Sequence, residues 1–245
     1  DLFLAPSRFT LEAHRERGFS RPMRHLPDFL PAAAALPAPI ASDDAARRPY
    51  FLFVGRLEKL KGVQTLLDAF RGYDAADLVI AGDGTYGPDL RRQAVGLAHV
   101  RFLGTVDSSA LRSLYAGAVA LLVPSVGFET FGMVSLEAFA QRTPVIVRGL
   151  GGLTEAVEDS GGGLVFRTQA ELLEGMETLR RDRALRDDLG RRGYAGWRRL
   201  WSAERHLGRY FGLLEELALA RGDADLARAA VAATPAAADA GVDVR

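Results

Sequence analysis

Short apolar segments recur along residues 50 to 166, separated by stretches long enough to hold a helix. Most lack the alternation of apolar and polar residues seen in half-exposed strands, so we predict strands covered on both faces. The six segments are FLFV (51–54), LVIA (78–81), VRFL (100–103), VALLV (119–123), PVIV (144–147) and LVF (164–166). The intervening residues follow helical spacing, as at Val63, Leu66, Leu67 and Phe70. This alternation predicts an α/β fold, a Rossmann-like parallel sheet with helices on both faces.

The flanking segments divide the chain into four parts. These are 1–26, a strand and a helix; 27–49, a proline-containing interdomain linker; 50–220, the sheet domain, all-helical beyond about 168; and 221–245, an alanine-rich tail, part helix and part frayed. Trp197, Trp201, Tyr210 and Phe211 are spaced to pack against another surface. Because the sequence starts at Asp1 inside a predicted buried strand, DLFLA, we interpret the start as a cut through a larger protein.

The composition narrows the classes of function. With 31 basic and 31 acidic residues the formal net charge is zero, whereas nucleic-acid-binding proteins usually carry a basic excess. The absence of cysteine excludes disulfides, thiolate metal sites and cysteine catalysis. The four histidines show no metal-ligand spacing, and no apolar run approaches the roughly 18 residues of a membrane-spanning helix.

Two cations follow the first strand of the sheet domain, in FLFVGRLEKLKG. Gly55 and Arg56 come directly after the strand, and Lys61 precedes the next helix. In open parallel sheets, ligands bind beyond the carboxyl ends of the strands. A helix start adds backbone N–H donors there, so the loop suits a diphosphate, although a solvated basic loop has the same appearance. At the next strand end, Asp83 stands in a Gly-Asp-Gly turn, a weak signal by itself.

Two glutamates eight positions apart follow the strand VALLV. Glu129 lies in the loop, and Glu137 lies about one turn inside a helix that we expect to begin near Gly132 or Met133. The first backbone N–H groups of that helix are available to an anion. Carboxylates repel phosphate but accept hydrogen bonds from hydroxyl groups, so the glutamates suit sugar rings on either side of a diphosphate. A helix-stabilising surface carboxylate and an exposed helix residue are the plain alternatives for Glu129 and Glu137.

The motifs ETFGMVSLEAFA, GRLEKLKG and TPVIVRGLGGLTEAV occur in collinear order, and residues 50 to about 215 resemble the group 1, retaining, nucleotide-sugar-dependent glycosyltransferases. DLFLAPSRFT resembles the last strand and helix of that family's first domain. The resemblance implies the GT-B architecture, two facing Rossmann-like domains, of which this chain holds the C-terminal, donor-binding half. It also implies an enzyme of carbohydrate biosynthesis whose substrate is a nucleoside diphosphate sugar.

The resemblance assigns roles to particular residues. It implies that Arg56 and Lys61 hold the diphosphate and that Glu129 contacts the transferred sugar, which makes these three the candidate catalytic residues. Glu137 would accept from the ribose hydroxyls. The donor-binding backbone would comprise Gly55, Phe131, Gly132, Met133 and Val134 near the phosphates or sugar, and Thr105 and Val106 near the base, with Asp83 nearby. No D-x-D metal motif accompanies these site motifs, so we expect no metal and no cofactor.

The sequence departs from the family pattern in three places. Most of the first domain is absent, and with it the acceptor site, so we expect the fragment alone to be inactive. PDFLP replaces the usual Asn-Gly after the hinge strand, and Thr154 replaces a proline in GLTEAV. Thr154 is expected to cap the following helix.

Other functions stay open. A nucleotide-sugar epimerase has a similar architecture, and a non-catalytic nucleotide-sugar-binding module would need no facing domain. A phosphorylase would need a lysine for pyridoxal phosphate, and the only lysines are Lys59 and Lys61. We expect a cytoplasmic protein, with attachment to the inner face of the membrane left open, and no nucleic-acid partner. The base, the sugar and the acceptor, whether sugar, lipid or small molecule, are not specified by the sequence.

Overall fold

A computed structural model describes residues 1–31 and 48–235. Within this part the main feature is a six-stranded parallel sheet with the strand order β5-β4-β3-β6-β7-β8. The strands are β3 (Tyr50–Val54), β4 (Asp77–Ala81), β5 (Val100–Gly104), β6 (Leu121–Val123), β7 (Val145–Arg148) and β8 (Gly163–Phe166). The six predicted strands are therefore confirmed, as is the parallel α/β sheet.

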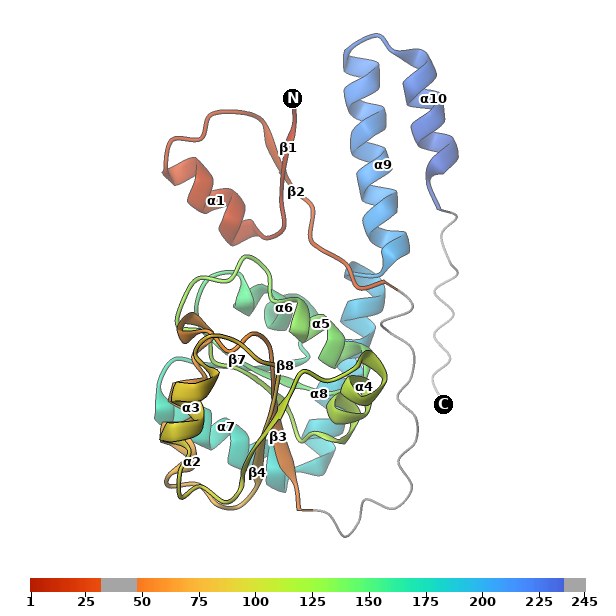
Figure 1. The fold of residues 1–245 in the computed structure, drawn as a ribbon. Helices are drawn as coiled ribbons and strands as arrows, with labels where there is room; N and C mark the ends of the chain where they lie inside the picture. The colour runs from red at the N-terminus through yellow and green to blue at the C-terminus, as the bar shows by residue number, and fades with distance from the viewer. Residues whose placement is uncertain (32–47, 236–245) are drawn as a thin grey trace.

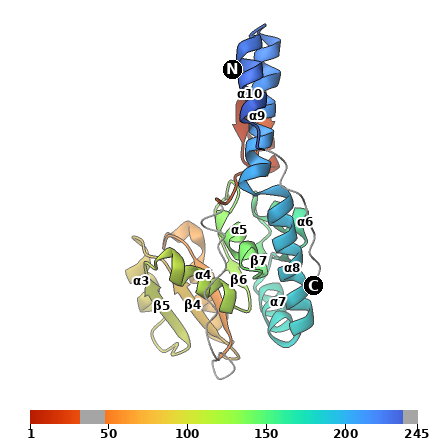
Figure 2. The same ribbon diagram turned by 90° about the vertical axis from the view of Figure 1, so that its right-hand side faces the viewer.

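Helices cover both faces of this sheet, as predicted (Figures 1 and 2). One face packs against α2 (Val63–Phe70), α3 (Gly87–Gln93) and α7 (Gln169–Arg181), and the other against α4 (Ser108–Gly117), α5 (Met133–Ala140) and α6 (Leu153–Ser160). The long helix α8 (Arg183–Leu200) contributes Leu189 to the first core and Trp197 to the second, so it passes from one layer to the other.

Apolar runs without alternation form these strands because both sides of the sheet are covered. In β3, Phe51 and Phe53 enter one core cluster while Leu52 enters the other. The strand β5 is an exception, since it lies at the edge of the sheet and leaves Arg101 and Leu103 exposed. The prediction of cover on both faces is therefore wrong for β5.

The direction of the chain crossings reverses between β3 and β6. From β3 the chain continues through α2 to β4 on one side, whereas from β6 it continues through α5 to β7 on the other. At such a switch point the loops after the two central strands diverge and leave a crevice beyond their carboxyl ends. The predicted ligand loops, after Val54 and after Val123, are these two loops.

A small N-terminal unit lies above the sheet domain in Figure 1 and consists of β1 (Phe3–Ala5), α1 (Arg8–Glu16) and β2 (Met23–His25). The prediction of one strand and one helix missed β2, which pairs parallel with β1. The sequence of β2, Met-Arg-His, carries no apolar run that would predict a strand. The predicted buried strand at 1–5 is only partly buried, because Phe3 and Leu4 are 42% and 41% exposed.

The predicted linker 27–49 falls mainly outside the described residues, which stop at 31 and resume at 48. Its described start runs along the sheet domain, where the Leu30 amide donates to the Trp201 carbonyl at 3.1 Å. His206 Nδ1 lies 2.8 Å from the carbonyl oxygen of Pro27. The beginning of this segment is therefore attached to the C-terminal helices.

The C-terminal helices α9 (Ala203–Ala220) and α10 (Ala224–Ala233) form a hairpin that projects from the sheet domain beside the N-terminal unit (Figures 1 and 2). Trp197 and Trp201 are buried against the second core, as their spacing predicted. The tail is helical over α10, and residues 236–245 lie outside the described part. No helix in the described part is long and apolar enough to span a membrane.

The expected cap at Thr154 is wrong. Helix α6 begins at Leu153 and its N-cap position is Gly152, with no side-chain cap. Because the turn at Gly151 and Gly152 ends one residue before Leu153, Thr154 lies inside the first helical turn, where its hydroxyl is past the capping position.

Candidate active site

A cavity of about 250 Å³ opens at the carboxyl ends of β3 and β6, the switch point of the sheet. Seven of the predicted site residues line it: Gly55, Lys61, Glu129, Phe131, Gly132, Met133 and Val134. The other lining residues are Asp28, Phe53, Val54, Val123, Ser125 and Thr130. The structure thus brings together residues from the loop after β3, the loop after β6 and the start of α5.

Lys61 and Glu129 form an ion pair in this cavity. Lys61 Nζ donates to Glu129 Oε1 over 2.6 Å, and Ser125 Oγ donates to the same oxygen over 2.7 Å. The two charged side chains are only 28% and 20% exposed. An ammonium has three donors, so one bond to Glu129 leaves two N–H groups of Lys61 for a ligand. The sequence predicted both residues as site residues but not the bond between them.

The start of α5 faces the same cavity. Gly132 holds the N-cap position with φ 92°, in the left-handed region, and no side chain caps the helix. A Cβ at this position would come within 2.7 Å of Leu153 Cδ2, so a glycine fits both the backbone angle and the space. The first amides of an uncapped helix lack intrahelical partners and attract anions. The predicted anion-binding helix start is therefore at the cavity wall.

A close backbone contact positions Lys61 against the loop after β6. Gly62 has φ 78°, and a Cβ there would lie 2.1 Å from the carbonyl oxygen of Pro124. Arg148, at the end of β7, donates from Nε to this same oxygen over 3.0 Å, and its NH2 donates to Thr65 Oγ1 over 3.1 Å. Burial lowers the pKa of the Arg148 guanidinium. These contacts fix the two ligand loops to each other.

Glu137 lies one turn further along α5 and is paired with Tyr115 of α4. The Tyr115 hydroxyl donates to Glu137 Oε2 over 2.6 Å. Burial raises the pKa of the Glu137 carboxyl, and the hydrogen bond from Tyr115 opposes this shift. Burial, and then the neighbouring Glu137, raise the pKa of Tyr115 well above its ordinary value. The Tyr115 hydroxyl therefore stays protonated at neutral pH and can donate to Glu137. Glu137 is not among the residues that line the cavity.

Besides Glu137, four predicted residues lie at the same edge of the sheet but outside the cavity. Arg56 is 76% exposed in its side chain and bonds Glu58 over 2.9 Å. Asp83 Oδ1 accepts from the Gly84 amide of its own turn. Thr105 is exposed just after β5, and Val106 packs against the second core. The roles predicted for these residues stay predictions.

Sequence reasoning missed Asp28, Ser125, Tyr115 and Arg148. Ser125 and Arg148 carried a usable signal, since both are polar residues directly at strand ends. Asp28 comes from the predicted linker and reaches the cavity from a distant part of the chain. Tyr115 is a buried aromatic residue of α4, and in the sequence it has the same appearance as an ordinary core residue.

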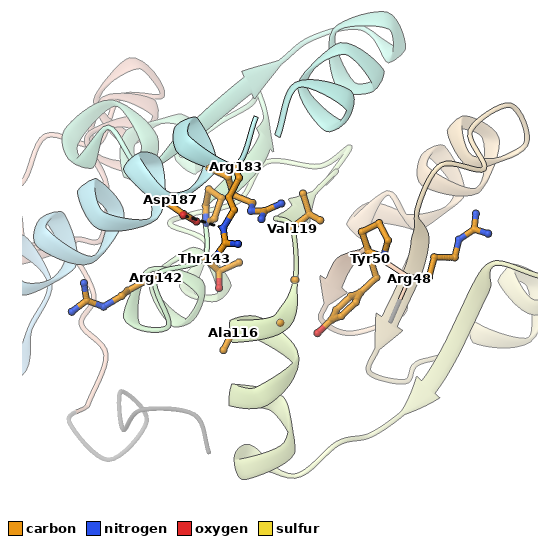
Figure 3. A pocket seen from close by; sticks show the side chains of 13 residues that line it. Arg48, Tyr50, Ala116, Val119, Arg142, Thr143, Arg183 and Asp187 are labelled. Atoms are coloured by element: carbon orange, nitrogen blue, oxygen red, sulfur yellow. Dashed lines mark ion pairs between the residues drawn. The ribbon is translucent and has the colours of Figure 1, made fainter. Parts of the chain in front are cut away.

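A second cavity, of about 370 Å³, lies at the opposite, amino-terminal edge of the sheet (Figure 3). Several arginines line it, but their charges have other partners. Arg48 bonds Asp77 over 2.8 Å, Arg183 lies 3.5 Å from Asp187, and the Arg142 guanidinium lies 4.3 Å from the ring centre of Tyr194. Although this cavity is larger, ligands of open parallel sheets bind at the other edge, so we place the candidate site in the smaller one.

Carboxylates and histidines do not converge in groups of three that could hold a metal ion anywhere in residues 1–31 and 48–235. The charged groups of the candidate site are Asp28, Lys61 and Glu129. The arrangement can bind an anion through Lys61 and the α5 amides, and hydroxyl groups through the carboxylates.

Residues 41–196 match the family model of the group 1 glycosyl transferases, and the chain belongs to this family. An uncharacterized glycosyltransferase of Methanocaldococcus jannaschii is 43% identical over 120 residues, 46% of this chain and 30% of that protein. A glycogen synthase of Thermus thermophilus is 37% identical over 127 residues, 50% of this chain and 29% of that protein. A phosphatidyl-myo-inositol mannosyltransferase of Mycobacterium leprae is 36% identical over 144 residues, 56% of this chain and 38% of that protein. The matched region thus spans about a third of these relatives.

Solved structures show the same fold. Sucrose-phosphate synthase of Thermosynechococcus elongatus superposes with a TM-score of 0.78 at 28% identity, covering 90% of this chain and 59% of that one. HepE of Anabaena, solved with UDP, gives a TM-score of 0.77 at 20% identity, covering 88% of this chain and 64% of that one. The architecture is that of the GT-B glycosyltransferases, as the sequence predicted.

Proposed function

We propose that this chain is the donor-binding half of a retaining glycosyltransferase that moves a sugar from a nucleoside diphosphate sugar to an acceptor. The single observation that carries the proposal is the cavity at the switch point, where the Lys61–Glu129 pair faces the uncapped start of α5. The Lys61 ammonium, the first amides of α5 and the Glu129 carboxylate all border this one small cavity. Such a set fits a ligand with a negatively charged centre and hydroxyl-bearing ends.

The diphosphate would lie between Lys61 and the amides of Met133 and Val134. As the bond to the sugar breaks, negative charge grows on the departing diphosphate, and preorganised donors in a partly buried site stabilise that charge. Arg56 would add a second cation by leaving Glu58, because an exposed ion pair contributes only about 0–1 kcal/mol. With two cations and a helix start in place, we propose that no divalent metal is needed.

The two glutamates would bind the two sugar rings. Glu129 keeps the oxygen Oε2 for hydroxyls of the transferred sugar, since Lys61 and Ser125 both donate to Oε1. Glu137 lies four residues beyond Met133, roughly 6 Å along the helix axis, which suits a ribose attached to the diphosphate. The backbone at Thr105 and Val106, beyond β5, would then meet the base.

The comparisons support this proposal through the relatives' own names. The similar proteins include a glycogen synthase and a mannosyltransferase, and structures of Anabaena HepE contain UDP, UDP with glucose, and UDP-glucose. The UDP-glucose in the last of these structures is a nucleotide sugar, the class of donor proposed here. The acceptor and its binding surface would belong to a facing domain, and a role close to the inner membrane surface stays open.

Calorimetry with nucleoside diphosphates tests the cation. Lys61→Ala should weaken binding by about 1.5–3 kcal/mol, or roughly 10- to 150-fold, the contribution of a hydrogen bond to a charged group. Lys59→Ala is the matched control, because Lys59 lies on the same short 3-10 turn but is exposed and outside the cavity. Equal affinity of the Lys61→Ala variant and the wild type would overturn the proposed site.

Retention of the anomeric configuration of the transferred sugar is tested by a separate measurement. Anomeric configuration of the product, followed by NMR with the donor and the protein joined to its facing domain, should match that of the donor. An inverted product, or epimerised donor without transfer to an acceptor, would contradict the proposal and favour a different reaction on this fold.

A further inference from the structure

Tyr115 is a phenol buried at the end of α4 with its hydroxyl directed at a carboxylate. Its ring is 1% exposed and packs in the second core, with Leu111 and Leu114 beside it. Thr143 Oγ1 donates to the Tyr115 carbonyl oxygen over 2.7 Å, which anchors the backbone of this residue. The position of the phenol oxygen is therefore fixed by packing and by a buried hydrogen bond.

Among residues 1–31 and 48–235, no cation pairs with Glu137. Within the described part of the chain, the only hydrogen bond to its carboxylate comes from Tyr115 to Oε2. A carboxylate that is partly buried and has a single donor retains acceptor capacity on both oxygens. If this position had only a structural role, an uncharged side chain would be more favourable, because burying an ion without an opposite charge costs free energy. The pair is thus set to receive further donors.

We propose that Tyr115 is a positioning residue that holds the Glu137 carboxylate in the orientation that accepts from both hydroxyls of a ribose, so that the site selects ribonucleoside over 2′-deoxyribonucleoside diphosphates. This inference rests on the proposed function. A vicinal diol offers two O–H donors with the spacing of two carboxylate oxygens, and a 2′-deoxyribose offers one. The missing donor leaves a partly desolvated carboxylate oxygen unpaired, which disfavours the deoxy ligand.

The fixed orientation comes from Tyr115 because the glutamate side chain itself is flexible. The bond from the phenol to Oε2 leaves Oε1 and the second lone pair of Oε2 without a protein donor in the described part of the chain. Without the phenol, the carboxylate can rotate to meet a single hydroxyl equally well. Loss of Tyr115 should therefore lower affinity for the ribo ligand more than for the deoxy ligand.

The experiment compares ribo and deoxy pairs by calorimetry: UDP with dUDP, GDP with dGDP, and ADP with dADP. The wild type should bind the ribo member of its preferred pair about tenfold or more tightly. Tyr115→Phe should reduce this ratio by about five- to tenfold, with little change in the affinity for the deoxy member. A purely structural role of Tyr115 would weaken both ligands together and leave the ratio unchanged.

Tyr73→Phe is the matched control, because Tyr73 also donates to a glutamate, Glu177, over 3.1 Å, but from the other core. This variant should keep the wild-type ratio. If Tyr115→Phe fails to fold, Glu137→Gln supplies the second test, since its neutral amide should also lower the ratio. An unchanged ratio in the folded variants, or equal binding of both ligands by the wild type, overturns the inference. Absence of any nucleoside diphosphate binding to the wild type would instead overturn the proposed function.

Discussion

Under the proposed function, Glu137 would favour ligand binding at the expense of the stability of the fold. Its pKa is raised by burial in the folded protein, so the folded state holds the Glu137 proton more tightly than the unfolded chain does. The tighter proton binding stabilises the folded state at pH values below the pKa of Glu137 in the unfolded chain. This stabilisation is lost as the pH rises through the pKa of Glu137 in the folded protein. At neutral pH the ionised carboxylate therefore destabilises the fold, and only a ligand with hydroxyl donors would compensate.

Replacing Glu137 by glutamine should separate these two effects. Glu137→Gln keeps an acceptor for the Tyr115 hydroxyl but removes the charge, so the melting temperature should rise at pH 7 while nucleotide affinity falls. The gain over the wild type should shrink as the pH falls to about 4, where the wild-type carboxyl is protonated too. Thermal unfolding at the two pH values measures this, and a lower melting temperature at pH 7 would contradict it.

Among the elements, α6 and α1 are joined by one buried carboxylate. Glu155 of α6 is 7% exposed and accepts from the amides of Arg8 and Phe9, over 2.9 and 2.7 Å, in the first turn of α1. Ser7 caps the same helix by accepting from the Thr10 amide. The sheet domain therefore supplies hydrogen-bond acceptors that the N-terminal unit lacks on its own.

Glu155→Ala should loosen this junction, because two partly buried amides would lose their acceptor. The expected cost is about 1–3 kcal/mol per unsatisfied group, confined to the N-terminal unit. Hydrogen exchange should speed up at Arg8 and Phe9 and stay unchanged in the central strands. Glu158→Ala is the control, since the ion pair of Glu158 in the described part of the chain is with the exposed Arg8 side chain, at 4.0 Å. Uniform exchange changes across the sheet would argue against a local junction.

Elements that depend on local sequence were predicted, whereas contacts between residues far apart in the sequence were not. The six strands and the start of α5 were predicted because apolar runs and a glycine before a helix are local signals. The pairing of Lys61 with Glu129 spans 68 positions and that of Tyr115 with Glu137 spans 22, so no local pattern contains them. The strand β2 was missed because parallel pairing with β1, and not its own sequence, makes it a strand.

At the scale of the whole molecule, ligand binding should appear as thermal stabilisation. A nucleoside diphosphate at about 100 times its Kd stabilises the folded state by about 2.7 kcal/mol, or roughly 5–11 °C for a domain of this size. A thermal-shift panel of UDP, GDP and ADP should identify one base with this effect. If no metal takes part, the shift should be equal in EDTA and in magnesium chloride. A shift that disappears in EDTA would contradict metal independence.

The connections at the top of the sheet domain restrict how the N-terminal unit can move. The segment after β2 and the bend between α8 and α9 run side by side, joined by the Leu30–Trp201 backbone bond and by the bridge from Leu30 to Ser202. Further along the chain, α1 is held to α6 by the Arg8 and Phe9 amides on Glu155 and by the two-bond Arg8–Asp159 ion pair. Any change in the orientation of the N-terminal unit would therefore have to break both contacts.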